Sequence, residues 1–275
     1  MSKSMDRKAI HCLTQWYQQA DRKPLVIRGA RQVGKTYLVR KFSANNGLQL
    51  VELNFEKRLD LKTLFDTNDP KRILLNLESH FNITINPLKS VLFLDEIQAV
   101  PELLAKLRWF AEEMPELPVL AAGSLLEFVL EDHQFSMPVG RVGYLYLEPF
   151  SFEEFIAAKG LDKLVTYLES YTLSDSLPHT IHEQLVELFQ EYTLVGGLPA
   201  AVSRWFQTES LSQVNEIHHN LVATYRDDFA KYAGRIQTEN LEKVLLAVPK
   251  MLGEKFVYSQ VKPIVRAQKA FEGQA

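Results

Sequence analysis

A glycine-rich segment near the N-terminus has the residue types and the spacing that bind a chain of phosphates. Residues 29–36 read Gly-Ala-Arg-Gln-Val-Gly-Lys-Thr and fit the pattern Gly, any four residues, Gly-Lys-Ser/Thr. Such a loop curls so that its backbone N–H groups point at phosphate oxygens, and it needs glycine where a side chain would collide or where φ is positive. Gly29 and Gly34 meet that need. We therefore predict a phosphate-binding loop at this position.

The segment also offers side chains for a nucleotide and its metal ion. Lys35 would reach the β and γ oxygens of a triphosphate, and the Thr36 hydroxyl would ligate Mg²⁺. The helix that follows would direct its positive N-terminal end at the phosphates. The alternative is a chance glycine turn, which background residue frequencies allow in roughly one in a hundred chains of this length. The predicted nucleotide-binding residues are Gly29, Ala30, Arg31, Gln32, Val33, Gly34, Lys35, Thr36 and Tyr37.

Two adjacent carboxylates, Asp95 and Glu96, follow a continuously apolar run that begins at residue 90. An Asp at the end of a strand can hold Mg²⁺, and an adjacent Glu can polarise the water that attacks the γ-phosphate. Alone, such a pair is more often a solvated strand end or a helix cap. Beside a phosphate loop it indicates a hydrolytic site, because a Glu in this place positions water rather than a substrate hydroxyl.

Ser124 follows another short apolar run and has two compatible interpretations. Its hydroxyl could contact the γ-phosphate or orient the attacking water. It could equally cap a helix expected from Leu125 to Leu130, with Glu127 at the capping-box spacing. The sequence leaves both interpretations open.

The elements that must position these residues alternate along the first half of the chain. Short apolar runs predict buried parallel strands at residues 24–28, 48–55, 90–94, 118–122 and 142–147. Helical patterns occupy residues 35–42 and 101–113 between them. Strands that alternate with helices predict an α/β fold with a doubly wound parallel sheet. From residue 151 to about residue 250 helical patterns succeed one another, which predicts a second, all-helical region.

Composition narrows the classes of partner and compartment. The 275 residues include 31 Lys and Arg against 34 Asp and Glu, a net charge of -3, so no global positive field indicates nucleic acid. A single cysteine, Cys12, excludes an internal disulfide and a cysteine zinc cluster and agrees with a reducing compartment. The charged N-terminus does not resemble a secretion signal, and no run approaches the ~20 apolar residues of a membrane span. We therefore expect a cytoplasmic protein without a membrane partner.

Further segments carry a resemblance to a known family. They are residues 93–98 (Phe-Leu-Asp-Glu-Ile-Gln), 122–124, 140–141, 147–155, 196–199 and 225–228. With the phosphate loop, they make residues 25–261 resemble the bacterial and archaeal AAA-type (AAA+ superfamily) P-loop ATP-binding proteins that have a C-terminal domain of unknown function. The resemblance implies ATP with Mg²⁺ as ligands, an AAA+-like nucleotide domain, a helical lid and the start of a winged-helix-like module.

The resemblance also implies roles for three residues outside the central motifs. Gly197 and Pro199 look like the turn that packs near adenine, and Arg141 looks like an arginine that contacts the γ-phosphate or faces a neighbouring subunit. The residues themselves permit simpler interpretations. The turn could be a helix C-cap followed by a helix start, and Arg141 could form a surface salt bridge.

Together these patterns predict four segments and one principal function. The segments are an N-terminal helix at 1–23, a nucleotide-binding domain at 24–150, a helical lid at 151–252 and an incomplete winged-helix-like segment at 253–275. Relatives continue further, so the chain looks C-terminally truncated. The predicted function is a Mg²⁺-dependent ATP hydrolase that acts as a conformational switch. A nucleic-acid-associated regulatory ATPase and a non-hydrolysing interaction scaffold are the alternatives, and a homo-oligomer or a protein partner stays open.

Overall fold

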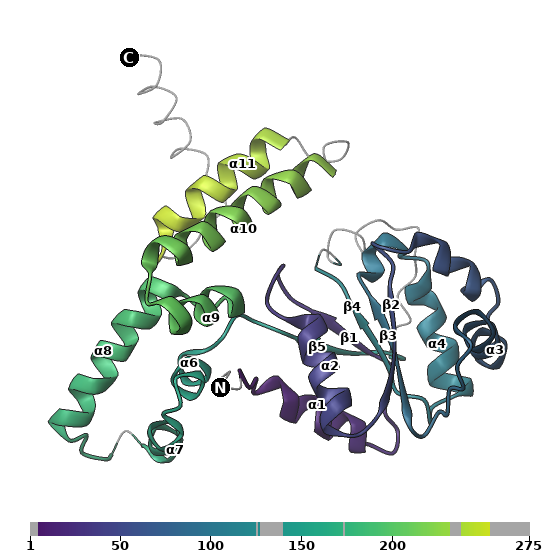
Figure 1. The fold of residues 1–275 in the computed structure, drawn as a ribbon, viewed down its shortest axis with the longest axis horizontal. Coiled ribbons are helices and arrows are strands. Elements are labelled where there is room, and N and C mark those ends of the chain that lie inside the picture. Colours follow the sequence, from purple (N-terminus) through teal and green to yellow (C-terminus); the bar gives the residue numbers. More distant parts are fainter. Residues whose placement is uncertain (1–4, 125, 127–139, 173, 232–237, 254–275) are drawn as a thin grey trace. The chain divides into compact units, whose positions relative to one another are not determined.

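The computed structural model describes residues 5–124, 126, 140–172, 174–231 and 238–253. The chain forms two compact units, Met1–Val214 and Asn215–Ala275 (Figure 1). The first unit contains a β-sheet, the helices that cover it and a series of helices that follows. The second unit consists of helices in its described part.

Five strands form one parallel sheet in the order β2-β3-β4-β1-β5. They are β1 (Leu25–Arg28), β2 (Gln49–Asn54), β3 (Ser90–Asp95), β4 (Val119–Ala122) and β5 (Gly143–Tyr146). Each predicted apolar run is one of these strands, so the predicted α/β sheet is confirmed. Every residue of β3 and β4 is buried, which explains why residues 91–94 of β3 and all of β4 are apolar.

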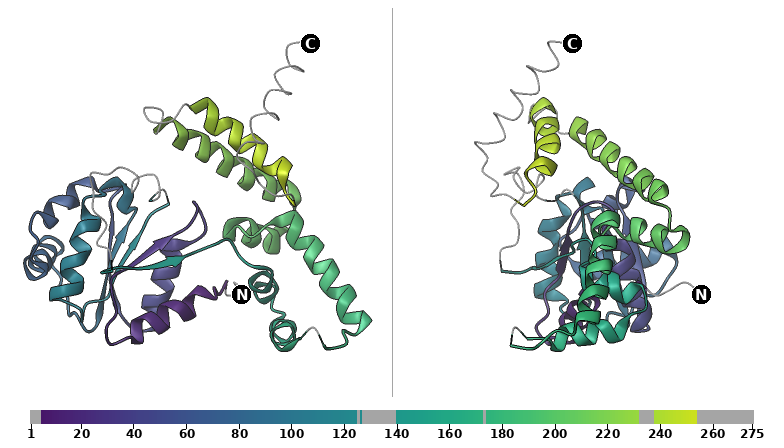
Figure 2. Two further views of the ribbon diagram at one scale, coloured as in Figure 1. Left: turned by 180° about the vertical axis from the view of Figure 1, so that it is seen from behind. Right: turned by 90° about the vertical axis from the view of Figure 1, so that its left-hand side faces the viewer.

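Helices cover both faces of the sheet (Figure 1), and Figure 2 shows the same two layers from behind. One face carries α1 (Ala9–Gln18) and α2 (Lys35–Asn45). The other face carries the short helix η1 (Leu59–Phe65) with α3 (Pro70–Phe81) and α4 (Leu103–Glu113). Successive side chains of a strand point to opposite faces of a sheet, so β1, β2, β3 and β4 each supply both cores.

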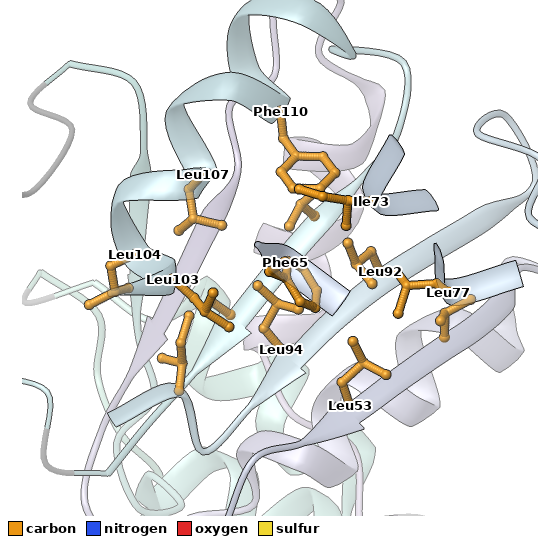
Figure 3. Close-up of a cluster of buried hydrophobic side chains, with 14 of the residues drawn as sticks. Leu53, Phe65, Ile73, Leu77, Leu92, Leu94, Leu103, Leu104, Leu107 and Phe110 are labelled. Carbon is orange, nitrogen blue, oxygen red and sulfur yellow. The ribbon is translucent and has the colours of Figure 1, made fainter. Parts of the chain in front are cut away.

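Strand β3 shows this alternation clearly. Leu92 and Leu94 lie in the core under α3 and α4, whereas Val91 and Phe93 lie in the core under α1 and α2. Figure 3 shows the first of these cores, where leucines of β2 and β3 gather with side chains of η1, α3 and α4. The two cores fix the sheet between its helices and so fix the ends of its strands.

The strand order decides which loops meet. Strand β4 lies between β1 and β3, with Leu120 beside Leu25 on one side and beside Phe93 on the other. Because all strands are parallel, their C-terminal ends share one edge of the sheet, which is where α/β sheets bind ligands. The loops after β1, β3 and β4 are therefore neighbours.

Helices continue to the end of the described chain, as the sequence predicts. They are α6 (Phe152–Ala158), α7 (Asp162–Ser170), α8 (His179–Val195), α9 (Pro199–Thr208), α10 (Leu211–Lys231), α11 (Thr238–Ala247) and the short helix η3 (Val248–Met251). A capping box of Ser151 and Glu154 begins α6. Phe155 of α6 packs against Tyr192 of α8, with ring centroids 5.4 Å apart. The boundary between the two compact units falls within α10.

Two sequence-based expectations fall largely outside the described residues. The helix expected from Leu125 to Leu130 has one described residue, Leu126, and the winged-helix-like segment expected at 253–275 has one, Gly253. Across the part of the chain that is described, no helix has both the length and the apolarity needed to cross a membrane.

Candidate nucleotide-binding site

The segment after β1 adopts the backbone that a phosphate loop requires. Gly29, Gln32 and Gly34 have φ values of 145°, 64° and 93°. A Cβ atom on Gly29 would lie 2.2 Å from the carbonyl oxygen of Leu147, so no larger residue fits without moving backbone. Gly34 then begins α2 as its N-cap. The two glycines thus meet the local steric demands that their spacing predicts.

The lysine of the phosphate loop folds back onto the first two residues of the loop. Lys35 is 7% exposed, and its ammonium donates hydrogen bonds to the carbonyl oxygens of Gly29 at 2.9 Å and Ala30 at 2.8 Å. Lys35 is also the first residue of α2, so the ammonium shares its surroundings with the positive end of that helix. Both features favour an anion at this place.

The acidic residue after β3 meets the loop after β1. Thr36 donates a hydrogen bond from Oγ1 to Oδ2 of Asp95 at 3.0 Å, and Asn54 at the end of β2 donates to the same oxygen at 3.2 Å. Burial raises the pKa of the Asp95 carboxyl, and the charge of Glu96 raises it further, while the two hydrogen bonds act in the opposite direction. A buried carboxylate with a raised pKa is a costly anion, and a cation beside it would offset that cost.

This arrangement fits Mg²⁺. The ion prefers hard oxygen ligands and usually takes only one or two from the protein, the rest coming from phosphate and water. The Thr36 hydroxyl and the Asp95 carboxylate provide two such oxygens within hydrogen-bonding distance of each other. These are the two residues that the sequence predicts as metal ligands.

Glu96 holds an uncommon backbone conformation at the same edge of the sheet. Its φ of 52° and ψ of 45° are left-handed, a region that costs energy for residues other than glycine. The next residue, Ile97, is fully buried in the core and begins the short helix η2 (Ile97–Ala99). The Glu96 carboxylate accepts a hydrogen bond at Oε2 from the side-chain amide of Gln98 at 2.6 Å. The strained turn thus directs a carboxylate beside Asp95.

Ser124 follows β4, the strand that separates β1 from β3. It therefore lies on the strand end between the phosphate loop and the two carboxylates. Its hydroxyl oxygen is buried and, within the described residues, has no hydrogen-bond partner. The helix-capping interpretation depends on residues 125 and 127, which lie outside the described residues.

The turn at residues 196–199 lies beside the phosphate loop. Gly196, with φ of 72°, ends α8, and Pro199 is the first residue of α9, so the helix cap and turn are both present. The Pro199 ring lies 3.8 Å from the point that a Cβ of Gly34 would occupy. The turn is also tied to the segment after β5, because the Phe150 amide donates to the Gly197 carbonyl at 2.7 Å.

The structure does not bring Arg141 to the phosphate loop of its own chain. Arg141 precedes β5, whose first residue, Gly143, pairs with Leu25 at the start of β1. This is the edge of the sheet opposite to the phosphate loop. Its guanidinium instead forms an ion pair with Glu112 at 2.8 Å, which is the surface salt bridge of the simpler interpretation. A contact of Arg141 with a neighbouring subunit stays a prediction.

Three residues near the site had no role in the sequence-based prediction. Asn54 and Gln98 donate hydrogen bonds to the two carboxylates, and the contact of Asn54 appears only once β2 and β3 are in register. The third is Arg7, which is 6% exposed and donates to the Val33 carbonyl of the phosphate loop at 2.8 Å. The N-terminal sequence has no pattern that could have indicated this contact.

The residues predicted to bind phosphate and Mg²⁺ and to activate water therefore gather at one edge of the sheet, whereas Arg141 does not. Donors for phosphate oxygens and a hydroxyl for a divalent ion follow β1, and the two carboxylates follow β3. This arrangement provides the groups that hydrolysis of a phosphoanhydride requires.

The chain is similar to known proteins in both its fold and its sequence. Among solved structures, the Walker-type ATPase PABY2304 of Pyrococcus abyssi aligns with 97% of this chain and 89% of its own at 17% identity and a TM-score of 0.48. C. elegans PCH-2 aligns with 79% of this chain and 67% of its own at 13% identity and a TM-score of 0.42. No curated protein sequence matches the chain. Residues 21–156 match the family model described as AAA domain, and residues 186–271 match a domain of unknown function, DUF8612. The chain thus contains an AAA domain, followed by a domain of unknown function.

Proposed function

We propose that the protein binds ATP with Mg²⁺ at residues 29–36 and hydrolyses its γ-phosphate. One observation carries the proposal, the 3.0 Å hydrogen bond between the Thr36 hydroxyl and Asp95. It joins the helix start after the phosphate loop to the strand end that carries the acidic pair. The contact supports an ATPase because it brings Asp95 to the edge of the sheet that carries Lys35.

In this proposal the phosphate groups bind to the backbone amides of the loop and to the Lys35 ammonium. Thr36 and Asp95 hold Mg²⁺, which neutralises charge on the phosphate oxygens when it is bound. Glu96 accepts a proton as the oxygen of water forms a bond to the γ-phosphorus. The bond from that phosphorus to the bridging oxygen breaks, and ADP and phosphate leave.

The helical region provides the proposed conformational response. Pro199 lies beside Gly34, so the start of α9 is next to the phosphate loop. A change in the loop on loss of the γ-phosphate would alter this contact, as happens in other nucleotide switches. Adenine would lie near this turn, which is the role that the family resemblance gives to Gly197 and Pro199.

Two substitutions separate binding from turnover. Lys35→Ala should abolish binding of a fluorescent ATP analogue, because it removes the ammonium that faces the phosphates. Glu96→Gln should retain binding and lower phosphate release by about 10²- to 10⁴-fold, the usual contribution of a general base. Lys62→Ala and Glu102→Gln change exposed residues of the same types and should alter neither quantity.

The two assays also discriminate between the proposals. Normal ATP hydrolysis by both Lys35→Ala and Glu96→Gln would refute the site. Tight ATP binding by the unaltered protein, without any release of phosphate, would favour the non-hydrolysing scaffold. Binding to nucleic acid that weakens steeply as salt rises would favour the regulatory ATPase.

A further inference from the structure

The side chain of Gln98 connects the acidic pair with the end of strand β4. Its amide nitrogen donates to Oε2 of Glu96 at 2.6 Å. Its amide oxygen lies against Gly123, so close that a Cβ atom on that glycine would be 2.4 Å away. Gly123 immediately precedes Ser124. Gln98 therefore spans the gap between the expected general base and the expected phosphate-sensing residue.

Two polar atoms in this gap are buried without a hydrogen-bond partner among the described residues. They are Oε1 of Gln98 and the hydroxyl oxygen of Ser124. Folded proteins pair nearly all buried polar atoms, and the exceptions mark strain, catalysis or a missing ligand. An unpaired carbonyl and an unpaired hydroxyl on either side of Gly123 are suited to a small polar molecule that donates and accepts hydrogen bonds.

The local backbone holds Gln98 firmly in this position. Ile97 is fully buried and fixes the chain between Glu96 and Gln98, so both side chains extend from one anchored turn. The left-handed conformation of Glu96 sharpens that turn. The absence of a side chain at Gly123 leaves the space that the Gln98 amide occupies.

We propose that Gln98 is a catalytic residue that orients the attacking water, an inference that rests on the proposed ATP hydrolysis. Its carbonyl oxygen accepts a hydrogen bond from one O–H of the water, and Glu96 takes the proton of the other O–H. The lone pair of the water oxygen then faces the γ-phosphorus. The amide nitrogen of Gln98 holds the Glu96 carboxylate by Oε2, so one side chain positions both the base and the nucleophile.

A purely structural role predicts a different pattern of effects. A structural glutamine has its amide oxygen paired, and its loss destabilises the fold. Here the oxygen is unpaired, so Gln98→Met, which has a similar shape and no polar oxygen, should retain or raise the Tm. A variant that keeps its stability and loses turnover shows that the residue serves the reaction.

The experiment measures three quantities for Gln98→Met. They are kcat from phosphate release, Kd for a non-hydrolysable ATP analogue, and Tm. We expect kcat to fall about 10- to 100-fold, a smaller loss than that of the general base itself, while Kd stays within about twofold. Gln18→Met, at an exposed glutamine of α1, is the matched control and should change none of the three.

A second variant keeps the test decisive if Gln98→Met does not fold. Gln98→Glu keeps an oxygen at the water but loses the N–H donor and places a second carboxylate beside Glu96, so its kcat should also fall. Unchanged or raised kcat in these variants would overturn the inference, as would a loss of Tm together with a loss of nucleotide affinity.

Normal turnover by Gln98→Met beside an inactive Glu96→Gln would refute this inference alone. Absence of turnover in the unaltered protein would refute the proposed function as well.

Discussion

Arg7 joins three segments around the phosphate loop, and its replacement should destabilise the fold. Its guanidinium donates to the carbonyl oxygens of Val33 and Glu148 and forms an ion pair with Glu154 at 3.2 Å. It also stacks over the ring of Phe150, 4.6 Å from the centroid. Arg7 and Glu154 are each 6% exposed, so solvent screens this pair little.

The burial of this ion pair sets the expected loss in the free energy of unfolding for Arg7→Met. Removal of one partner of a buried ion pair costs about 3–5 kcal/mol, because it leaves the other charge uncompensated. Glu154 keeps hydrogen bonds from the backbone N–H groups of Lys8 at 2.7 Å and Ser151 at 3.0 Å, which places the loss toward the lower end of that range. In a unit of this size 3 kcal/mol corresponds to a fall in Tm of about 6–12 °C.

Thermal unfolding of the full chain, followed by circular dichroism, measures this shift. Arg58→Met is the matched control, because Arg58 forms a comparable pair with Asp60 that is exposed to solvent. Surface pairs contribute little, so its Tm should stay within about 2 °C of the unaltered protein. The double variant Arg7→Met with Glu154→Gln should recover part of the loss, since it removes the uncompensated charge.

The same variant tests whether Arg7 supports the phosphate loop. Without the guanidinium, the Val33 carbonyl loses its donor, so nucleotide affinity should fall together with Tm. Equal Tm shifts for Arg7→Met and Arg58→Met would show that the buried contacts stabilise nothing, and the reasoning from burial would be wrong.

Two further predictions concern the loop and its acidic partner. Gly29→Ala should prevent nucleotide binding, because its Cβ would lie 2.2 Å from a backbone oxygen, whereas Gly47→Ala, with no atom within 4 Å, should bind nucleotide normally in the same fluorescence titration. Asp95→Asn should raise the Tm of the nucleotide-free protein at pH 7, because burial raises the pKa of the carboxyl above its ordinary value of 3.8 and so makes its ionised form costly. The stability contributed by Asp95 is present below pH 3.8 and is lost as pH rises through the raised pKa, so the advantage of Asp95→Asn should disappear in thermal scans at low pH. A lower Tm for Asp95→Asn at pH 7 would contradict this.

The sheet and the phosphate loop could be predicted because their requirements are local. A strand that is buried on both faces is apolar along its interior, as β3 is at residues 91–94. A loop with φ of 145° at Gly29 and 93° at Gly34 must have glycine there, whatever surrounds it. Such constraints are visible in a single sequence.

The roles of Asn54 and Arg7 could not be predicted because they depend on register and on distant contacts, and the approach of Gln98 to Gly123 likewise appears only in the fold. Asn54 meets Asp95 because these residues pair in the β2-β3 ladder, which no local pattern specifies. Arg7 and Glu154 are 147 positions apart in the sequence. The family likeness gave Arg141 two alternative roles, and strand register places it away from the phosphate loop of its own chain, so a contact with a neighbouring subunit stays a prediction.

Contacts between backbones explain how the proposed switch could reach the helical region. The Phe150 amide donates a hydrogen bond to the Gly197 carbonyl, and a Cβ on Gly197 would lie 2.4 Å from the Phe150 carbonyl oxygen. The backbones of these two segments therefore touch without intervening side chains. The next residues place Pro199 against Gly34 of the phosphate loop. Rotamer changes cannot absorb a displacement at such contacts, because no flexible side chain lies between them. In the proposed switch, movement of the loop would shift the start of α9 or break the Phe150 hydrogen bond, and either event would report the state of the nucleotide.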